Sequence, residues 1–176
     1  MIKLKNYKPV GLDRGSSRVT EMLWWVVRSI LFAPLFPLPS ALKVVMLRLF
    51  GAKVGKGVVI RSRVNITMPW RFEIGDDVWI GDQVYILSLA PVIIGSNVCI
   101  SQRAFLCTGS HDFSKESFDL LTGPIEVGES CWIGAQAFVG PDVVMGNASR
   151  CLAGAVVVKD VGDGQVVGGV PAKVFT

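Results

Sequence analysis

Apolar residues recur every six positions between residues 127 and 161. The run reads VGESCWIGAQAFVGPDVVMGNASRCLAGAVVVKDV, and each six starts with an apolar residue and has a small or branched residue in fifth place. The first positions are Val127, Ile133, Val139, Met145, Cys151 and Val157. A period of six matches neither the 3.6-residue repeat of a helix nor the two-residue alternation of a simple strand. It is typical of a β-helix built from hexapeptide repeats, in which every six forms one short strand and a bend.

The same period begins at Val54 and is interrupted at three places. The first positions advance by eight after Ile66 and again after Ile86, and by twenty-one after Leu106. Three sixes make one triangular coil of about eighteen residues, which gives five coils. The expected coils are 54–71, 74–91, 94–111, 127–144 and 145–162. We therefore predict an all-β solenoid of about five coils, with extra residues at one corner around 68–70 and 90–91.

The longest interruption, residues 111–126, reads HDFSKESFDLLTGPIE and separates the third and fourth coils. An extended loop inside a regular solenoid is more often functional than incidental. The loop opens with His111, which is the only histidine of the chain. After the last coil, residues 163–176 form a C-terminal tail that contains a Gly-Gly pair, a proline and a final cation, Lys173.

The first fifty residues do not follow the repeat and form a separate segment, so residues 51–176 make up the solenoid domain. Residues 1–20 are polar and irregular, and we expect a poorly ordered arm. An apolar run from 22 to 32 predicts a helix, which is broken by the prolines at 34, 37 and 39. Ser40 is a candidate N-cap for a second helix over 41–50, which ends at a glycine.

Charge is unevenly divided along the chain. Residues 1–63 hold twelve Lys/Arg against two Asp/Glu, whereas residues 64–176 hold six against twelve. A basic amino-terminal third suggests a membrane surface or a phosphate-rich ligand as its neighbour, although a solvated basic face is an equally good explanation. Residues 22–50 are too interrupted to span a bilayer. We expect them either to lie on a membrane surface or to cap the end of the solenoid or a neighbouring subunit.

The four cysteines, Cys99, Cys107, Cys131 and Cys151, contain no CxxC pair, and no histidine cluster accompanies them. We therefore expect neither a disulfide framework nor a metal site. Cys131 and Cys151 occupy inward repeat positions, so we expect them to be core thiols in a reducing compartment. No signal peptide is expected, because the first apolar run begins only near Met22 and no short charged segment precedes it. The expected location is cytoplasmic, with the inner membrane face as a further possibility.

Several separated stretches resemble a known family. The repeats, the HDFS loop, WIGAQAFVGPDVVMG and VVGGVPAKV together resemble the hexapeptide-repeat acyltransferases over residues 50–175. LRLFGAKVG, SLAPVIIG and ISQRAFLCTGSHDFS are similar to the colanic-acid-type polysaccharide O-acetyltransferases. The resemblance implies a left-handed parallel β-helix, although the spacing does not show that hand. It also implies a homotrimer with active sites between subunits, and acetyl-CoA laid along the coils.

The resemblance assigns roles to individual residues. His111 matches the catalytic base, and Asp112 or another carboxylate is expected to orient its ring. Trp132 matches an aromatic residue that either lines the cleft or simply packs. The small sugar acetyltransferases carry an acceptor-binding Asn at the end of the second coil, where this chain has Leu87 and Ser88, so Ser88 is expected to supply a polar contact or an oxyanion donor. The positions that match contacts to coenzyme A are Ala135, Ala153, Lys159 and Lys173.

These residues suit O-acetyl transfer, because a positioned imidazole can accept the proton of a sugar hydroxyl as that hydroxyl attacks a thioester. We therefore expect an acetyl-CoA-dependent O-acetyltransferase acting on a cell-surface polysaccharide sugar or its lipid-linked precursor. Two alternatives remain open: an acetyltransferase for a small acceptor such as an antibiotic, serine or amino sugar, and a non-catalytic trimeric scaffold. Nucleic acid is not an expected partner, because the coils are acidic and the basic segment is apolar.

Overall fold

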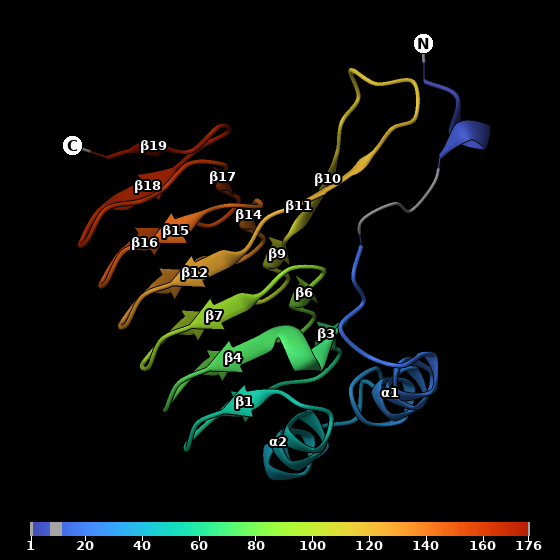
Figure 1. Cartoon of the computed structure of the whole chain (residues 1–176). Coiled ribbons are helices and arrows are strands. Elements are labelled where there is room, and N and C mark those ends of the chain that lie inside the picture. Colours follow the sequence, from blue (N-terminus) through green and yellow to red (C-terminus); the bar gives the residue numbers. More distant parts are fainter. Residues whose placement is uncertain (1, 8–11, 176) are drawn as a thin grey trace.

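The computed structural model describes residues 2–7 and 12–175 and forms a left-handed parallel β-helix with three faces (Figure 1). The first face contains β1 (Lys53–Val54), β4 (Phe72–Ile74), β7 (Val92–Ile94), β12 (Ile125–Val127) and β15 (Val144–Met145). The second contains β2 (Val59–Ile60), β5 (Trp79–Ile80), β8 (Cys99–Ile100), β13 (Trp132–Ile133), β16 (Arg150–Cys151), β18 (Val166–Gly168) and β19 (Lys173–Val174). The third contains β3 (Asn65–Ile66), β6 (Tyr85–Leu87), β9 (Phe105–Cys107), β14 (Phe138–Val139) and β17 (Val156–Val157).

The first residue of each six-residue repeat points into the prism. From Ile60 to Val157, every first position of a six is buried. Neighbouring coils are joined by parallel pairing in register, as where Ile86 of β6 lies opposite Leu106 of β9. Each strand is only two or three residues long, so it is stable only when stacked on its neighbours. The prediction of a β-helix is confirmed.

The third coil ends earlier than the spacing predicts. The predicted third coil runs to residue 111, but Ser110 is exposed and lies in β10 (Gly109–His111), which pairs antiparallel with β11 (Leu120–Thr122). The last buried residue of the coil is Thr108, whose carbonyl accepts a hydrogen bond from the backbone N–H of Gly123. The insertion is therefore a hairpin that leaves and re-enters the solenoid at a single corner.

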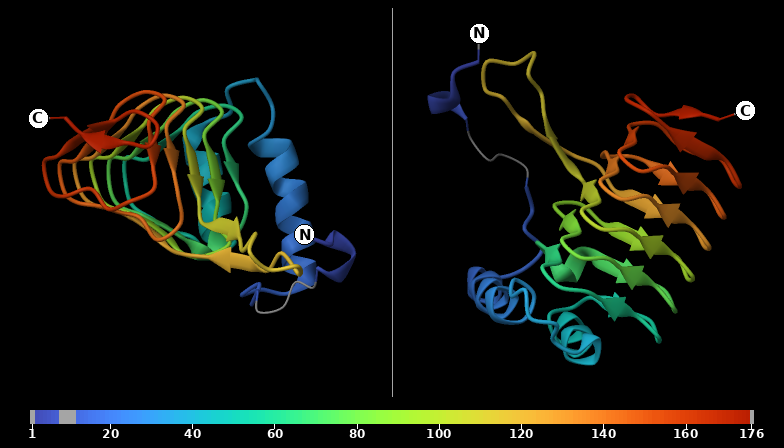
Figure 2. Two further views of the ribbon diagram at one scale, coloured as in Figure 1. Left: turned by 90° about the horizontal axis from the view of Figure 1, so that it is seen from above. Right: turned by 180° about the vertical axis from the view of Figure 1, so that it is seen from behind.

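The residues after the fifth coil continue the solenoid. Val161 forms a parallel bridge with Met145, and β18 adds a further rung to the second face. β19 then folds back antiparallel on β18. The final segment thus lies over the last rung and covers that end of the prism, as Figure 2 shows from above.

The amino-terminal helices cover the opposite end of the prism. α1 (Arg18–Leu31) begins before the expected residue 22, because Ser17 caps it by accepting a hydrogen bond from the N–H of Thr20. α2 (Ser40–Leu49) is not capped by the Ser40 side chain. The Ser40 hydroxyl instead accepts a hydrogen bond from the N–H of Ile60, which docks the helix on the first coil.

Large side chains from the two helices fill the space below the first coil. Trp24, Phe32 and Leu47 are buried, and the indole N–H of Trp24 donates to the carbonyl of Ile66. The buried ammonium of Lys43 donates to the carbonyls of Ile60 and of residue 61. Burial lowers the pKa of Lys43. The interpretation of residues 22–50 as a cap on the solenoid end is therefore correct.

All four cysteines are free thiols, and Cys107, Cys131 and Cys151 are buried. Burial raises the pKa of the Cys151 thiol, which keeps it protonated and unreactive. Within residues 2–7 and 12–175, no helix has the length and apolar character needed to cross a bilayer.

Replacing an inward residue of a central coil should destabilise the fold. Ile86 is fully buried between two coils, so Ile86→Ala should lower the free energy of unfolding by about 2–5 kcal/mol. The matched control is Ile93→Ala, because Ile93 points outward from β7 and should cost below about 1 kcal/mol. Denaturant unfolding at fixed protein concentration measures both changes. Equal losses for the two variants would contradict the assignment of inside and outside.

Candidate active site

The sole histidine lies on the hairpin that projects from the corner after the third face. Strands β10 and β11 pair His111 with Leu120, and Figure 2 shows the hairpin standing away from the coils. The amino-terminal arm reaches the same hairpin, since Lys3 forms an ion pair with Glu116 at 2.5 Å. The arm that was expected to be irregular therefore contributes to the surroundings of the histidine.

Aromatic side chains enclose the imidazole of His111. Its ring stacks on Phe118 with centroids 4.2 Å apart and planes 3° from parallel. Tyr7 of the arm meets the same ring edge-on at 5.9 Å. The imidazole is half-buried between these two rings, which restricts its rotation.

A backbone carbonyl fixes the orientation of the His111 ring through one of its nitrogens. Nδ1 of His111 lies 2.9 Å from the carbonyl oxygen of Phe118. A carbonyl can only accept, so Nδ1 must carry the hydrogen, and in the neutral ring Nε2 is left as the acceptor. Phe118 has a φ of +52°, the left-handed conformation that is rare for an aromatic residue. The arrangement leaves Nε2 able to accept a proton from a substrate.

Asp112 does not orient the histidine. Its carboxylate accepts hydrogen bonds from the N–H and the hydroxyl of Ser114 and forms an ion pair with Lys115. The bonds from Ser114 hold the pKa of Asp112 below its ordinary value. Asp112 thus shapes the turn after β10, and the orienting acceptor is the Phe118 carbonyl. Sequence reasoning missed Phe118, whose only signal was an aromatic residue seven positions after the histidine.

Ser88 does not face a cleft. It is fully buried, and its hydroxyl donates to the carbonyl of Met68 at 3.0 Å and accepts from the N–H of Met68 at 2.9 Å. These bonds tie together the corner residues of two successive coils. A hydroxyl committed in this way is not available as the expected acceptor contact or oxyanion donor.

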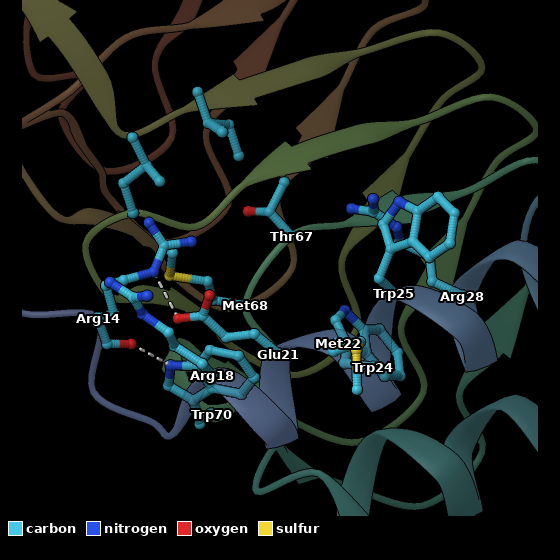
Figure 3. A pocket seen from close by; sticks show the side chains of 12 residues that line it. Arg14, Arg18, Glu21, Met22, Trp24, Trp25, Arg28, Thr67, Met68 and Trp70 are labelled. Carbon is cyan, nitrogen blue, oxygen red and sulfur yellow. Dashed lines mark hydrogen bonds and ion pairs between the residues drawn. The ribbon is translucent and has the colours of Figure 1, made fainter.

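A cleft of about 670 Å³ lies between α1 and the same corner of the first two coils (Figure 3). In Figure 3, Arg14, Arg18 and Glu21 gather at one end, and Trp25 and Arg28 lie at the other. The remaining lining residues are Met22, Trp24, Thr67, Met68, Trp70, Leu87 and Leu89. Sequence reasoning missed this cleft, since it had considered residues 68–70 and Leu87 only as corner positions and Met22 only as the start of an apolar run.

The predicted coenzyme-contacting residues fall into separate places. Ala135 and Ala153 lie on successive rungs of one corner, between the second and third faces, and the N–H of Gly154 donates to the carbonyl of Ala135. A Cβ added at Gly134 would come within 2.5 Å of the N of Ala153, so these rungs pack closely at that corner.

The other predicted residues lie elsewhere on the solenoid. Lys173 is exposed on β19, and Lys159 is exposed beyond β17, at the corner after the third face. Trp132 is exposed on the second face, where its indole N–H donates to the hydroxyl of Ser101 at 2.9 Å. Across the described ranges 2–7 and 12–175, no three His, Cys, Asp or Glu side chains gather as a metal site would require.

Known proteins share this architecture and sequence. No family model matches the chain. The Escherichia coli protein WcaF, which carries the name colanic acid biosynthesis acetyltransferase, is 40% identical over 92% of this chain and 89% of its own length. The galactoside O-acetyltransferase of Escherichia coli is 29% identical over 70% of this chain and 63% of its own length.

Solved structures of acetyltransferases share the fold. The hexapeptide-repeat acetyltransferase of Vibrio cholerae, solved with acetyl-CoA, superposes with a TM-score of 0.83 at 22% identity, over 98% of this chain and 95% of that one. Together, the sequence matches and the fold define an acyltransferase. The chain belongs to the hexapeptide-repeat acetyltransferase family.

The tautomer of His111 can be observed directly, because the chain has a single histidine. Long-range ¹H–¹⁵N spectra of the untagged protein at alkaline pH, where the ring is neutral, should show a protonated Nδ1 and an unprotonated Nε2. The reason is the Nδ1 hydrogen bond to the Phe118 carbonyl. Predominance of the Nε2–H form would contradict this geometry.

Proposed function

We propose that the chain is an acetyl-CoA-dependent O-acetyltransferase that acts on a hydroxyl of a cell-surface polysaccharide sugar or its lipid-linked precursor. The observation that carries the proposal is the sole histidine, which is held by a backbone carbonyl so that Nε2 can accept a proton. Membership of the acetyltransferase family and the 40% identity to WcaF support the reaction and the class of acceptor. The name of the galactoside relative supports a sugar hydroxyl.

In the proposed reaction, Nε2 of His111 takes the proton of the acceptor hydroxyl as that oxygen attacks the thioester carbonyl. The new bond joins the acceptor oxygen to the acetyl carbon, and the bond from that carbon to sulfur breaks. The departing sulfur receives the proton from the imidazolium, so free coenzyme A and an acetyl ester result. The Phe118 carbonyl stabilises the transient cation through Nδ1–H. Base assistance of this kind contributes roughly 10²–10⁴ in rate.

Acetyl-CoA is proposed to lie along the corner that carries Ala135 and Ala153. Small side chains on closely packed successive rungs support this assignment, because they let a narrow pantetheine chain approach the backbone. We also propose that the exposed side chains of Lys159 and Lys173 contact coenzyme A. The exposed indole of Trp132 is proposed to contact the acceptor.

We propose a homotrimer, which the positions of these groups in one chain support. His111 follows the third-face strand β9, whereas Ala135 and Ala153 precede the third-face strands β14 and β17. The two corners are separated by about six residues of extended chain, on the order of 20 Å. Within one chain, the histidine is therefore too far from the coenzyme corner to act on acetyl-CoA bound there. In a ring of subunits, the histidine of one subunit could face the coenzyme corner of its neighbour.

Peripheral contact with the inner membrane face is also proposed. The helical segment exposes large apolar side chains to solvent, and the first sixty-three residues are strongly basic. The exposed set is Val19, Met22, Leu23, Trp25, Val26, Ile30, Leu35, Phe36, Leu42, Val45 and Leu49. An apolar surface of this extent beside basic residues fits an anionic bilayer surface.

Replacing the base should separate binding from turnover. His111→Ala should retain acetyl-CoA binding, measured by calorimetry, and lose acetyl transfer to acceptor or water by a factor of about 10²–10⁴, measured as free thiol. Phe118→Ala, which keeps the backbone carbonyl, should lose less than His111→Ala. Full activity of His111→Ala would exclude the histidine as base. No acetyl-CoA binding by the native protein would instead favour a non-catalytic scaffold.

Membrane association should depend on the turn between the two helices. Leu35 and Phe36 are about 70% exposed there, and their replacement disturbs no helix. Leu35→Asp with Phe36→Asp should reduce co-sedimentation with anionic phospholipid vesicles at least tenfold, because charge is costly in the apolar layer. The control is Val158→Asp, at an exposed apolar position far along the solenoid. Equal vesicle binding by both variants would exclude contact through this segment.

A further inference from the structure

The cleft beside α1 carries an excess of positive charge. Arg14, Arg18 and Arg28 line it, and Glu21 is the one acidic residue among its lining residues. Arg14 forms an ion pair with Glu21 at 2.5 Å, and Arg28 donates to the amide oxygen of Asn65 at 3.0 Å. Among the described residues, nothing forms an ion pair or hydrogen bond with the guanidinium of Arg18. An exposed guanidinium beside a cleft is well suited to bind a phosphate oxygen pair.

The same cleft has apolar walls. Met22 and Trp25 contribute from α1, and Leu87 and Leu89 contribute from the second coil. Met22 and Trp25 are about 60% exposed and belong to the apolar surface of the helical segment. An apolar chain in the cleft could therefore continue onto that surface without crossing polar groups. A ligand that suits both features has an anionic centre and a long apolar part.

The cleft adjoins the strand that carries the proposed base. A Cβ placed on Gly109, the first residue of β10, would lie 3.0 Å from Leu89 and 3.5 Å from Leu87. Residues two apart in a strand share a face, so His111 lies on the same side of β10 as Gly109, about 7 Å further along. A sugar attached to a phosphate in the cleft would therefore extend toward His111.

We propose that this cleft binds the phosphate or diphosphate of a lipid-linked sugar, with Arg18 as the principal phosphate ligand, Met22 and Trp25 as the binding surface for the start of the lipid, and Leu87 and Leu89 on the side that leads the sugar to His111. The proposal rests on the proposed function, because it identifies the acceptor of the acetyl group. The arginines of the cleft would then determine which acceptor is bound. The acceptor would be the lipid-linked precursor rather than the finished polysaccharide.

The charge of the cleft also selects against other acceptors. An aminoglycoside or a free amino sugar carries an ammonium group at neutral pH, which three guanidinium groups against one carboxylate would repel. A neutral glycan would leave Arg18 without a partner. A nucleotide-linked sugar provides the same diphosphate but no apolar chain, so a comparison of the two ligands separates the two sources of phosphate.

Calorimetry on the untagged full chain tests the proposal with farnesyl diphosphate, farnesol and uridine diphosphate as probes. Farnesyl diphosphate should bind more tightly than either of the others, because only it engages both the arginines and the apolar walls. Arg18→Gln should weaken its binding about tenfold and leave farnesol unchanged, since a hydrogen-bonded charge pair contributes roughly this factor. Lys53→Gln removes the same charge from an exposed position on β1 and should have no effect.

Three results would overturn the proposal: no binding of farnesyl diphosphate, an unchanged dissociation constant in Arg18→Gln, or uridine diphosphate binding as tightly as farnesyl diphosphate. The test is independent of catalysis, because His111→Ala should bind farnesyl diphosphate as the native protein does. If the native protein does not use acetyl-CoA, the proposed function fails, while the binding comparison still decides what the cleft recognises.

Discussion

The fold depends on hydrogen bonding between coils, because no strand is long enough to be stable alone. Each rung contributes two or three residues per face and pairs in parallel register with the rungs above and below. At least one inward residue per strand, such as Ile86 or Ile133, packs against its counterparts in neighbouring rungs. Register and burial therefore fix each other, since a slip of one residue would turn the apolar side chains outward. Pairing between coils therefore fixes the position of every corner along the solenoid axis and the direction in which it projects.

The corner after the third face is where the period is broken, and both the histidine hairpin and the cleft beside α1 lie at that corner. In the first coil the extra residues form a short 3₁₀ turn, η2 (Pro69–Arg71), and in the third they expand into the histidine hairpin. Buried hydroxyls replace apolar residues at this corner, since Ser88 and Thr108 bond to the backbone of the coil below. Regular coils thus provide the rigid support, and the insertions at one corner carry the histidine proposed as the base.

The two faces of the amino-terminal segment differ in their surroundings. Its inner face closes the open end of the prism with Trp24, Phe32, Leu47 and the buried ammonium of Lys43. Its outer face is apolar and exposed, and its edge supplies the arginines of the cleft. The cap and membrane interpretations are therefore compatible, because different side chains of the same helices carry them.

The sequence by itself determined the β-helix and singled out His111 with its loop, because a six-residue period dictates which side chains point inward and where the period fails. It could not determine the environment of the histidine, since the Phe118 carbonyl and Tyr7 reach the ring through a left-handed residue and a distant arm. It also placed Ser88 and Asp112 in the site, although both use their polar atoms for local backbone and turn contacts. The cleft combines side chains about seventy residues apart in sequence, from α1 and the second coil. Only tertiary packing brings such residues together, because a repeat pattern specifies burial along the chain but not which surfaces meet.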